Sequence, residues 1–247
     1  MKTVLITGCS SGFGLETARH FLAQGWQVVA TMRTPRADVL PASERLHVLP
    51  LDVTDAASIR DCIAAAGPID VLVNNAGIGL LGAVEGIPVD RMREIFETNT
   101  FGTMALTQAV LPQMRERRSG VVINVTSSVT LKALPLLAVY TASKAAVNAF
   151  TEVLALELRP FGIRASVVLP GRSPTTRFGE NARARMQGSI PEAYADLAGR
   201  VFAGWAESTE AVTQAQDVAQ AVWRAATDPT CPPRLAAGAD AVALLPR

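Results

Sequence analysis

The chain has 247 residues, a length that suits one α/β domain, and its 49% hydrophobic and 18% charged content excludes an intrinsically disordered protein. A formal net charge of +1 without a long basic run excludes a nucleic-acid-binding surface. The three cysteines and two histidines are widely spaced, so we expect reduced thiols, no disulfide framework and no metal site.

The apolar segment at residues 3–7 is too short for the apolar region of a signal peptide and leads directly into a glycine-rich loop. No uninterrupted apolar run approaches the ~20 residues that a helix needs to cross a bilayer. We therefore expect a soluble, cytoplasmic protein that does not act at a membrane.

Short apolar runs rich in β-branched residues alternate with amphipathic segments along the chain. Near-continuous hydrophobicity is typical of parallel strands that helices cover on both faces. The alternation predicts an α/β fold built on a single doubly wound parallel sheet. The expected strands cover residues 3–7, 26–32, 46–53, 69–77, 120–127 and 163–171, and a final apolar piece at 240–245 is interpreted as an edge strand.

Capping signals bound the helices between these strands. Gly25 ends the amphipathic stretch that begins at Leu15, as a C-terminal glycine commonly does. Asp55 is expected to cap the start of the next helix, and Gly67–Pro68 to end it. Longer helical stretches are expected at about 88–117 and 139–158.

The segment from about residue 172 to 211 departs from this rhythm, with balanced charges, scattered glycines and prolines, and helical pieces. It follows the end of an expected strand, where the ligand sites of doubly wound sheets lie. We interpret it as a variable helical lid over a substrate site, within one Rossmann-type catalytic domain that spans residues 1–247.

The first strand leads into a helix through a loop that contains several glycines. Glycines let the backbone turn sharply and approach a pyrophosphate, and the start of a helix presents free N–H groups. Because the loop follows the first strand and opens a helix, it predicts a dinucleotide site. The expected cofactor contacts in this loop are Gly8, Ser10, Ser11, Gly12, Phe13 and Gly14.

The end of the second strand indicates which dinucleotide is bound. A site that prefers NAD usually places a carboxylate there, which accepts hydrogen bonds from the adenosine ribose. Residues 30–33 contain no acid and end in Arg33. A guanidinium group can pair with a 2′-phosphate, so we expect NADP (NADPH) as the cofactor.

Tyr140 and Lys144 lie four residues apart in an expected helix, and Ser127 lies thirteen positions before the tyrosine. Positions i and i+4 share a helix face, so the ammonium group can lie beside the phenol. An unperturbed tyrosine has a pKa of about 10. The neighbouring cation is expected to lower the pKa of Tyr140 towards the range where general acid–base catalysis is efficient.

The glycine loop, the motif Asn74–Asn75–Ala76–Gly77, and the Ser127, Tyr140 and Lys144 set occur in an order and spacing that resembles a short-chain dehydrogenase/reductase. The resemblance covers nearly the whole chain and is most specific up to Gly171. It implies an NADP-dependent oxidoreductase that transfers a hydride between the cofactor and a carbonyl/alcohol pair, acting on CH–OH donors.

The resemblance also implies roles for the catalytic residues. Tyr140 would act as general acid and base, and Ser127 would donate a hydrogen bond to the carbonyl oxygen. The family spacing favours Ser127 over its neighbour Ser128. Lys144 would lower the pKa of Tyr140 and bind the nicotinamide ribose, and Asn99 would hold a backbone distortion and complete a proton relay through water.

Further cofactor contacts follow from the same resemblance. In the family, a Pro-Gly pair beside the nicotinamide is followed by a threonine that contacts the carboxamide. Thr175 fits this spacing, but Ser173–Pro174 replaces the usual apolar pair, so Thr176 is the alternative. The implied contacts are Asp52 and Val53 at the adenine, Asn75, Ala76 and Gly77 along the adenosine ribose, and Tyr140, Lys144, Pro170, Gly171 and Thr175 at the nicotinamide half.

The expected pocket segments, residues 78–86, 129–139 and the lid, are rich in leucine and aromatic residues, which favours an apolar ketone, aldehyde or secondary alcohol. An acidic substrate is the alternative to an apolar one, because Lys132 and Arg172 could bind its negative charge. A non-catalytic NADP-binding regulator is the alternative, which the intact Tyr140 and Lys144 disfavour. A sugar-nucleotide epimerase would need a longer C-terminal substrate domain.

The helices expected at about 88–117 and 139–158 carry more apolar surface than one sheet face covers. Closed symmetric oligomers are the usual way to bury such a surface. The resemblance implies that these two helices pair across a two-fold axis. We therefore expect a homodimer or homotetramer, with a small-molecule substrate as the other partner.

Overall fold

The computed structural model describes residues 1–174, 176 and 178–245. Within these residues, seven parallel strands form one sheet in the order β3-β2-β1-β4-β5-β6-β7. The crossover direction reverses between β1 and β4, as in doubly wound sheets, so the predicted fold class is confirmed. The strands are Thr3–Thr7 (β1), Gln27–Met32 (β2), Leu46–Pro50 (β3), Val71–Asn74 (β4), Gly120–Val125 (β5), Ile163–Pro170 (β6) and Arg234–Ala237 (β7).

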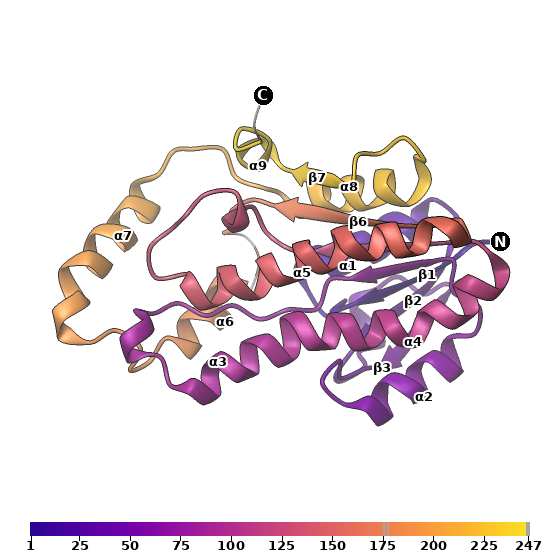
Figure 1. Cartoon of the computed structure of the whole chain (residues 1–247), viewed down its shortest axis with the longest axis horizontal. Helices are drawn as coiled ribbons and strands as arrows, with labels where there is room; N and C mark the ends of the chain where they lie inside the picture. The colour runs from indigo at the N-terminus through magenta and orange to yellow at the C-terminus, as the bar shows by residue number, and fades with distance from the viewer. Residues whose placement is uncertain (175, 177, 246–247) are drawn as a thin grey trace.

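Helices cover both faces of this sheet (Figure 1). α1 and α8 pack on one face, and α2, α4 and α5 pack on the other. The helices are Gly12–Ala23 (α1), Ala56–Ala66 (α2), Val89–Phe96 (α3), Gly102–Arg117 (α4), Ala138–Leu158 (α5), Phe178–Arg185 (α6), Ala195–Glu207 (α7), Ala215–Thr227 (α8) and Ala239–Val242 (α9). Among the described residues, no helix is long and apolar enough to cross a membrane.

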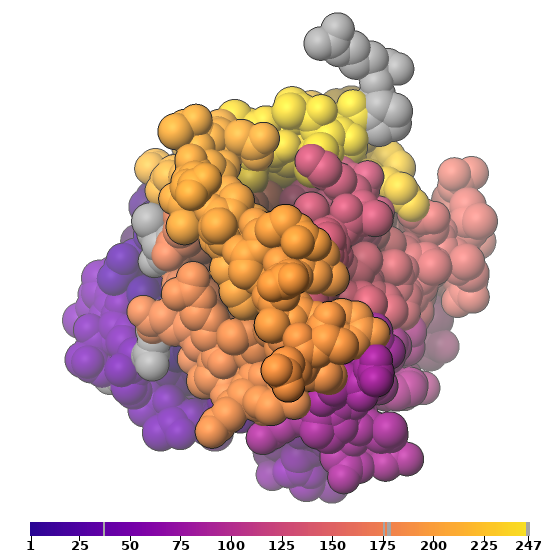
Figure 2. Space-filling view, turned by 90° about the vertical axis from the view of Figure 1, so that its left-hand side faces the viewer, coloured from indigo at the N-terminus to yellow at the C-terminus, as the bar shows by residue number. Residues whose placement is uncertain are grey.

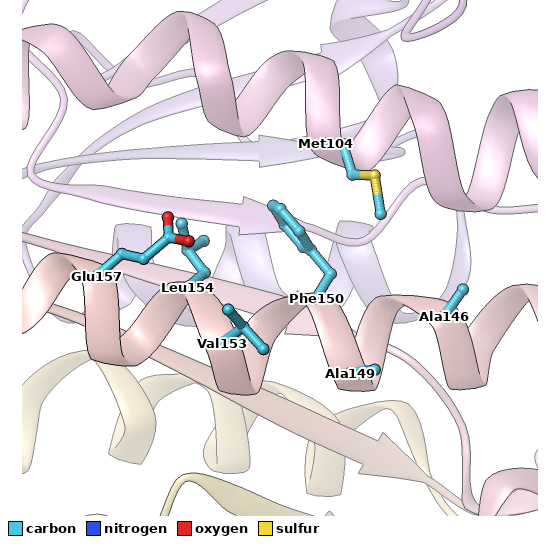
Figure 3. Close-up of a pocket in the computed structure, with 7 residues that line it drawn as sticks. All are labelled: Met104, Ala146, Ala149, Phe150, Val153, Leu154 and Glu157. Atoms are coloured by element: carbon cyan, nitrogen blue, oxygen red, sulfur yellow. The ribbon is translucent and has the colours of Figure 1, made fainter.

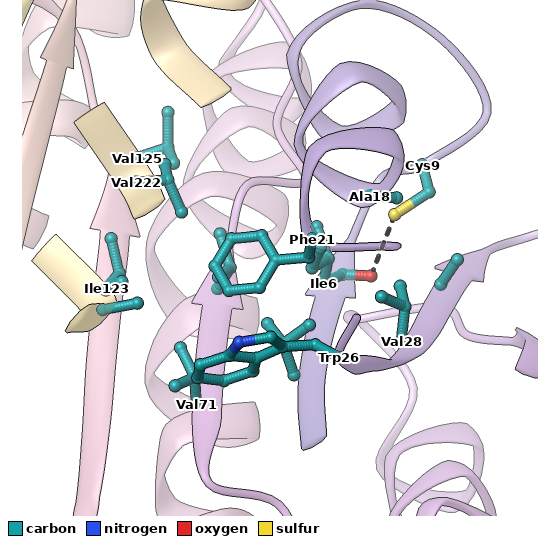
Figure 4. Packing of buried hydrophobic residues seen from close by; sticks show 14 of the residues in the cluster. Ile6, Cys9, Ala18, Phe21, Trp26, Val28, Val71, Ile123, Val125 and Val222 are labelled. Atoms are coloured by element: carbon teal, nitrogen blue, oxygen red, sulfur yellow. Dashed lines mark hydrogen bonds between the residues drawn. The ribbon is translucent and has the colours of Figure 1, made fainter. Parts of the chain in front are cut away.

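Aromatic side chains lock α1 against the sheet (Figure 4). The rings of Phe21 and Trp26 meet edge to face with their centroids 5.2 Å apart, and Trp223 from α8 approaches Phe21 at 5.0 Å. In the same cluster the buried Cys9 thiol donates to Ile6 O (3.2 Å), and burial raises the pKa of this thiol to about 12. Cys9 is therefore a packing residue that joins the glycine loop to the core.

The capping predictions are confirmed. α1 ends at Ala23 and is followed by Gly25 in a left-handed conformation. The Asp55 carboxylate accepts hydrogen bonds from the first turn of α2, at 3.0 Å and 3.3 Å. Gly67 follows the last residue of α2. These capping residues fix where α1 ends and where α2 begins and ends, and so where the chain turns back towards the next strand.

The edge strand predicted at residues 240–245 is wrong. The edge of the sheet is β7, which pairs with β6 as far as Pro170 and Ala237. Gly238, with a φ of 93°, turns the chain out of the sheet, and α9 follows at once. Ala241 is buried, so the apolar residues of this run supply the buried side of α9 and not an edge strand.

A π-helical turn interrupts the long helix predicted at about 88–117. α3 ends at Phe96, the π-helical turn covers Glu97–Phe101, and α4 begins at Gly102. Such turns are rare and frequently lie at functional sites. Here the turn contains the buried Asn99.

The carboxyl ends of the parallel strands meet at one edge of the sheet. α6 and α7 lie beyond this edge, on the left of Figure 1. Figure 2 looks onto the same end of the molecule, and residues of the 172–211 segment, in orange, cover its centre. A ligand at the strand ends would therefore lie beneath this segment.

Candidate active site

The loop between β1 and α1 is tightly folded around its glycines. Gly8 has a φ of 75°, a conformation that favours glycine. A Cβ atom added at Gly14 would collide with the carbonyl oxygen of Gly8, so the start of α1 packs directly on the strand end. Gly12 opens the helix, Ser10 is exposed, and the partly buried Phe13 packs against the core.

The start of α1 is suited to bind an anion. Ser11 is the N-cap residue, and within the described chain its side chain makes no capping bond to α1. The first N–H groups of a helix lack intrahelical partners and lie at the positive end of its dipole. A glycine loop with this start therefore fits the phosphates of a dinucleotide.

Thr7, the last residue of β1, holds the neighbouring strand end in place. Its hydroxyl accepts hydrogen bonds from Asn75 N (2.9 Å) and Ala76 N (2.8 Å), and the Asn75 side chain donates to Thr7 O (2.8 Å). Gly8 packs closely on Ala76. The Asn75–Ala76 backbone therefore lies locked beside the glycine loop. Thr7 was not among the predicted site residues, although a threonine before the first loop glycine is a usable signal.

Two arginines, Arg33 and Arg36, follow β2 near the glycine loop. Two hydrogen bonds, which the Thr54 N–H (2.9 Å) and the Thr54 hydroxyl (2.7 Å) donate to Asp52, are the larger cause that holds the pKa of Asp52 below its ordinary value. Arg33 is exposed, and its charge also helps to lower the pKa of Asp52. Arg36 Nη2 donates to Ser10 O at 3.1 Å, across the loop. Arg36 was not among the predicted site residues, although a second arginine three positions after Arg33 is a visible signal.

Val53 lies under the start of α4. A Cβ atom added at Gly102 would come within 2.7 Å of the Val53 side chain. The contact holds the loop after β3, including Asp52, against the helix that follows the π-helical turn. Asp52 and Val53 therefore lie at the same edge of the sheet as the glycine loop.

Ser127 and Tyr140 meet at the carboxyl end of β5. Their side chains form a hydrogen bond, and both residues are buried, with 9% and 5% of their surface exposed. Ser127 caps a short 3-10 turn, in which Val129 N donates to its hydroxyl at 3.3 Å. The structure therefore brings Ser127 and Tyr140 together as the spacing predicts.

Burial dominates the electrostatics of this site. It raises the pKa of Tyr140 well above its ordinary value, and the hydrogen bond with Ser127 acts in the opposite direction. Burial also lowers the pKa of Lys144 to about 8. The predicted lowering of the Tyr140 pKa is therefore wrong for this structure, because desolvation of the buried phenol outweighs the hydrogen bond with Ser127.

Lys144 and Asn99 converge beside Gly77. The Lys144 ammonium donates to Val125 O at 3.1 Å. A Cβ atom added at Gly77 would lie 3.2 Å from both Lys144 Nζ and Asn99 Oδ1. The absence of a side chain at Gly77 therefore leaves room for an amide and an ammonium group to share this point.

Asn99 holds the backbone around it with both ends of its amide. Its Oδ1 accepts from Ile78 N (2.8 Å), and its Nδ2 donates to Ile78 O (2.9 Å) and to Ser143 Oγ (3.1 Å). The Ser143 hydroxyl donates in turn to Tyr140 O at 2.7 Å. The distortion expected at Asn99 is thus the π-helical turn, and Ser143, one position before Lys144, links it to the tyrosine backbone.

The chain after β6 lies against the glycine loop. Pro170 ends β6, and Gly171 N donates to Thr213 Oγ1 at 2.9 Å. Thr176 donates its hydroxyl to Ser173 O (3.0 Å), and a Cβ atom added at Gly12 would lie 3.5 Å from Thr176. Thr175, the predicted carboxamide contact, lies outside the described residues.

The 172–211 segment is docked on the chain that precedes α3 and on α3 itself. Arg185 pairs with Glu94 at 3.3 Å, and the Tyr194 hydroxyl donates to Glu85 at 2.9 Å. An apolar cluster joins the segment to Ala83 and Leu136. It comprises Ala83, Leu136, Ile190, Tyr194, Leu197, Ala198, Val201 and Phe202.

Comparison with known proteins decides the family. A model of the short chain dehydrogenase family matches residues 2–186. The chain belongs to the short-chain dehydrogenase family. The predicted resemblance is confirmed, and this short-chain dehydrogenase is an oxidoreductase.

Individual proteins that resemble this short-chain dehydrogenase are also described as oxidoreductases or dehydrogenases. It is 36% identical over 240 residues to the uncharacterised oxidoreductase YusZ of Bacillus subtilis (strain 168), across 92% of this chain and 85% of that protein. It is 44% identical over 184 residues to retinol dehydrogenase 8 of Bos taurus, across 69% of this chain and only 58% of that protein. A solved structure of serine dehydrogenase complexed with NADP+ has a TM-score of 0.80 and 31% identity, covering 96% of this chain and 94% of that one.

Proposed function

We propose that this enzyme interconverts a ketone or aldehyde and the corresponding alcohol with NADP(H), acting on an apolar substrate. The observation that carries the proposal is the meeting of Ser127, Tyr140 and Lys144 at the carboxyl end of β5. The glycine loop lies at the same edge of the sheet. A proton donor and a hydrogen-bond donor are therefore placed beside a site that fits a dinucleotide.

When bound, the nicotinamide supplies the hydride, and the protein orients and polarises the carbonyl group. Ser127 donates a hydrogen bond to the carbonyl oxygen as that oxygen gains negative charge. Tyr140 delivers a proton to the same oxygen. Its raised pKa keeps the phenol protonated at neutral pH, which suits the reductive direction.

Lys144 and Asn99 support this proton transfer. Lys144 has a pKa of about 8, so it remains largely protonated at neutral pH and favours the phenolate that forms at Tyr140. Asn99 holds the π-helical turn beside Lys144 and would complete a proton relay. Lys144 would also bind the nicotinamide ribose. The adenosine ribose would lie along Asn75, Ala76 and Gly77.

The preference for NADP rests on the arginines after β2. Arg33 is exposed where an acid is missing, and Arg36 lies across the glycine loop on Ser10 O. A pair of guanidinium groups can hold a 2′-phosphate, and Ser10 and Ser11 can add hydroxyl donors. The NADP+ complex of the related serine dehydrogenase supports this choice.

The apolar substrate is inferred from what surrounds the site. The apolar cluster that the 172–211 segment forms with Ala83 and Leu136 joins the start of the Tyr140 helix to Phe202 of α7. The name of retinol dehydrogenase 8 indicates an apolar alcohol for that relative, which supports the same substrate class here. The 172–211 segment would then act as the substrate lid.

A screen of NADPH oxidation tests the function directly. We expect turnover with apolar ketones, aldehydes or keto-esters, and little turnover with charged analogues of the same size. Arg33→Asp should shift the preference from NADPH towards NADH, whereas Arg60→Asp, on the exposed face of α2, should not. NADPH binding without turnover on any carbonyl would favour the non-catalytic regulator. Equal binding of NAD and NADP by the wild type would contradict the proposed NADP preference.

We also propose that the enzyme forms a homodimer or homotetramer through α4 and α5. Phe101, Val153 and Leu156 are more than half exposed, at 54%, 57% and 64%. A hollow of about 400 Å³ lies between the two helices (Figure 3), lined by Met104, Ala146, Ala149, Phe150, Val153, Leu154 and Glu157. Small and apolar residues on both helices suit a self-complementary contact across a two-fold axis.

A further inference from the structure

The two ends of the 172–211 segment are tied together by residues from the C-terminal part of the chain. Thr213 N donates to Arg172 O at 2.8 Å, which closes the base of the segment. The Thr213 hydroxyl accepts from Gly171 N at 2.9 Å. Asp240, on α9, accepts from Arg172 N at 2.7 Å. Gly171 N also donates to Ala237 O at 3.2 Å, so four hydrogen bonds hold the Gly171–Arg172 backbone where it enters the segment.

Thr213 and Asp240 also hold each other. The Thr213 hydroxyl lies 2.7 Å from Asp240 Oδ1 and 2.9 Å from Ala237 O, so it can donate to either. Thr213 is completely buried, so water cannot replace a lost partner at this hydroxyl.

Two glycines make the approach of these side chains possible. A Cβ atom added at Gly171 would collide with the Asp240 carboxylate, and one added at Gly238 would collide with the Thr213 hydroxyl. The carboxylate and hydroxyl therefore reach the backbone of residues 171–172 only because these two positions lack side chains. The contact is close-packed as well as hydrogen-bonded.

This contact lies next to the reacting groups. Gly171 directly follows β6, and β6 pairs with β5, whose end leads into Ser127. Thr126 N donates to Val168 O at 2.8 Å, which ties the two strand ends. Arg172 Nη1 donates to Trp205 O at 3.1 Å, so the same base also reaches the end of α7.

We propose that Thr213 and Asp240 act as positioning residues: they clamp the Gly171–Arg172 backbone and the base of the 172–211 segment at the nicotinamide half of the site. The inference rests on the proposed function. Displacement of reacting groups by about 1 Å can lower a rate by about 10²-fold, so a loosened clamp should reduce turnover without disturbing the adenine half.

Pairs of substitutions at Thr213 and at Asp240 distinguish the loss of the clamp's hydrogen bonds from a general loss of stability. Thr213→Val keeps the shape and removes the hydroxyl, whereas Thr213→Ser keeps the hydroxyl. Asp240→Ala removes both acceptors, whereas Asp240→Asn keeps one oxygen for Arg172 N and offers an N–H to Thr213. Val242→Ala, on the exposed side of α9, controls for disturbance of the helix.

Three measurements are made on each variant: kcat with NADPH, the dissociation constants of NADPH and of 2′,5′-ADP, and hydrogen exchange by mass spectrometry. We expect Thr213→Val and Asp240→Ala to lower kcat roughly 10- to 100-fold and to weaken NADPH more than 2′,5′-ADP, which lacks the nicotinamide half. Faster exchange should be confined to residues 171–213 and 237–242. The serine, asparagine and Val242→Ala variants should stay close to the wild type.

Unchanged kcat in folded Thr213→Val and Asp240→Ala would overturn the clamp, as would equal weakening of NADPH and 2′,5′-ADP. If the wild type binds NADPH but reduces no carbonyl, the proposed function fails, and the two dissociation constants and the exchange pattern still decide the clamp. If the wild type binds neither nucleotide, both proposals fail.

Discussion

Burial of single residues sets the charges at the centre of the site. Tyr140 and Lys144 are both almost fully buried, and desolvation favours the neutral form of each. At neutral pH the pair therefore consists of a neutral phenol and a largely protonated lysine whose pKa is about 8. This differs from the simple expectation of a tyrosine activated by a permanent positive charge.

The lowered pKa of Lys144 predicts a pH dependence of stability. The folded-state pKa is about 8, against an ordinary value of 10.5, so between these values the unfolded state binds more protons. The free energy of unfolding contributed by this group therefore rises as pH rises through that window. Lys144→Met cannot titrate, so the stability of the wild type relative to this variant should rise by roughly 1–3 kcal/mol from pH 7.5 to 10.

Urea denaturation of both proteins at the two pH values measures this difference. Tyr140 is present in both, so its titration cancels to first order. A difference between wild type and Lys144→Met that is constant with pH would show that Lys144 does not titrate in this range.

The adjacent serines give a second prediction at this scale. Ser127 forms the hydrogen bond with Tyr140, and Ser128 follows in the 3-10 turn. Ser127→Ala should lower kcat roughly 10²–10³-fold, the usual cost of a lost oxyanion donor, and Ser128→Ala much less. Steady-state kinetics of the two variants decide the point. The reverse ranking would mean that the register of the site is wrong by one residue.

At the scale of elements, the strands and caps were predictable because their signals are local. Six apolar runs became β1 to β6, and Gly25 and Asp55 bound their helices as expected. The π-helical turn at Asn99 and the strand β7 were not assigned from the sequence pattern alone. Arg234–Ala237 is short and begins with a charged residue, so its pairing with β6 depends on tertiary context.

The residues of the candidate site also divide into those with a local sequence signal and those that depend on tertiary contacts. Ser127, Tyr140 and Lys144 were found because their spacing is short and specific. Thr213 and Asp240 were not found, because they act on residues 171–172 through contacts across 41 to 68 positions. Nothing local in the sequence distinguishes them from other polar residues near a turn.

The glycine loop gives a prediction for an element. Gly14→Ala places a methyl group against the backbone of Gly8, which cannot move aside as a side chain can. The variant should lose about 1–3 kcal/mol of stability and bind dinucleotides more weakly. Gly199→Ala in α7 is the matched control, because its added methyl meets nothing within 4 Å and should stabilise by up to about 1 kcal/mol. Thermal unfolding with and without NADPH tests both, and a Gly14→Ala protein as stable as the wild type would refute the close contact.

At the scale of the whole molecule, the exposed face of α4 and α5 predicts self-association. Light scattering at micromolar concentration should give a dimer or tetramer mass. Leu156→Arg, which places a charge on the most exposed apolar position of this face, should shift the mass towards the monomer. A wild-type monomer would contradict the proposed interface.

The role of Tyr140 as proton donor is tested most directly by the effect of Tyr140→Phe on turnover and on cofactor binding, measured on the same preparation with a carbonyl substrate that the wild type reduces. The phenylalanine keeps the buried ring and removes only the proton donor. If Tyr140 donates the proton, the dissociation constant of NADPH should stay within about threefold while kcat falls at least 10²-fold, the scale of general acid catalysis. Turnover close to that of the wild type, with NADPH binding retained, would contradict the assignment of the reaction to Tyr140.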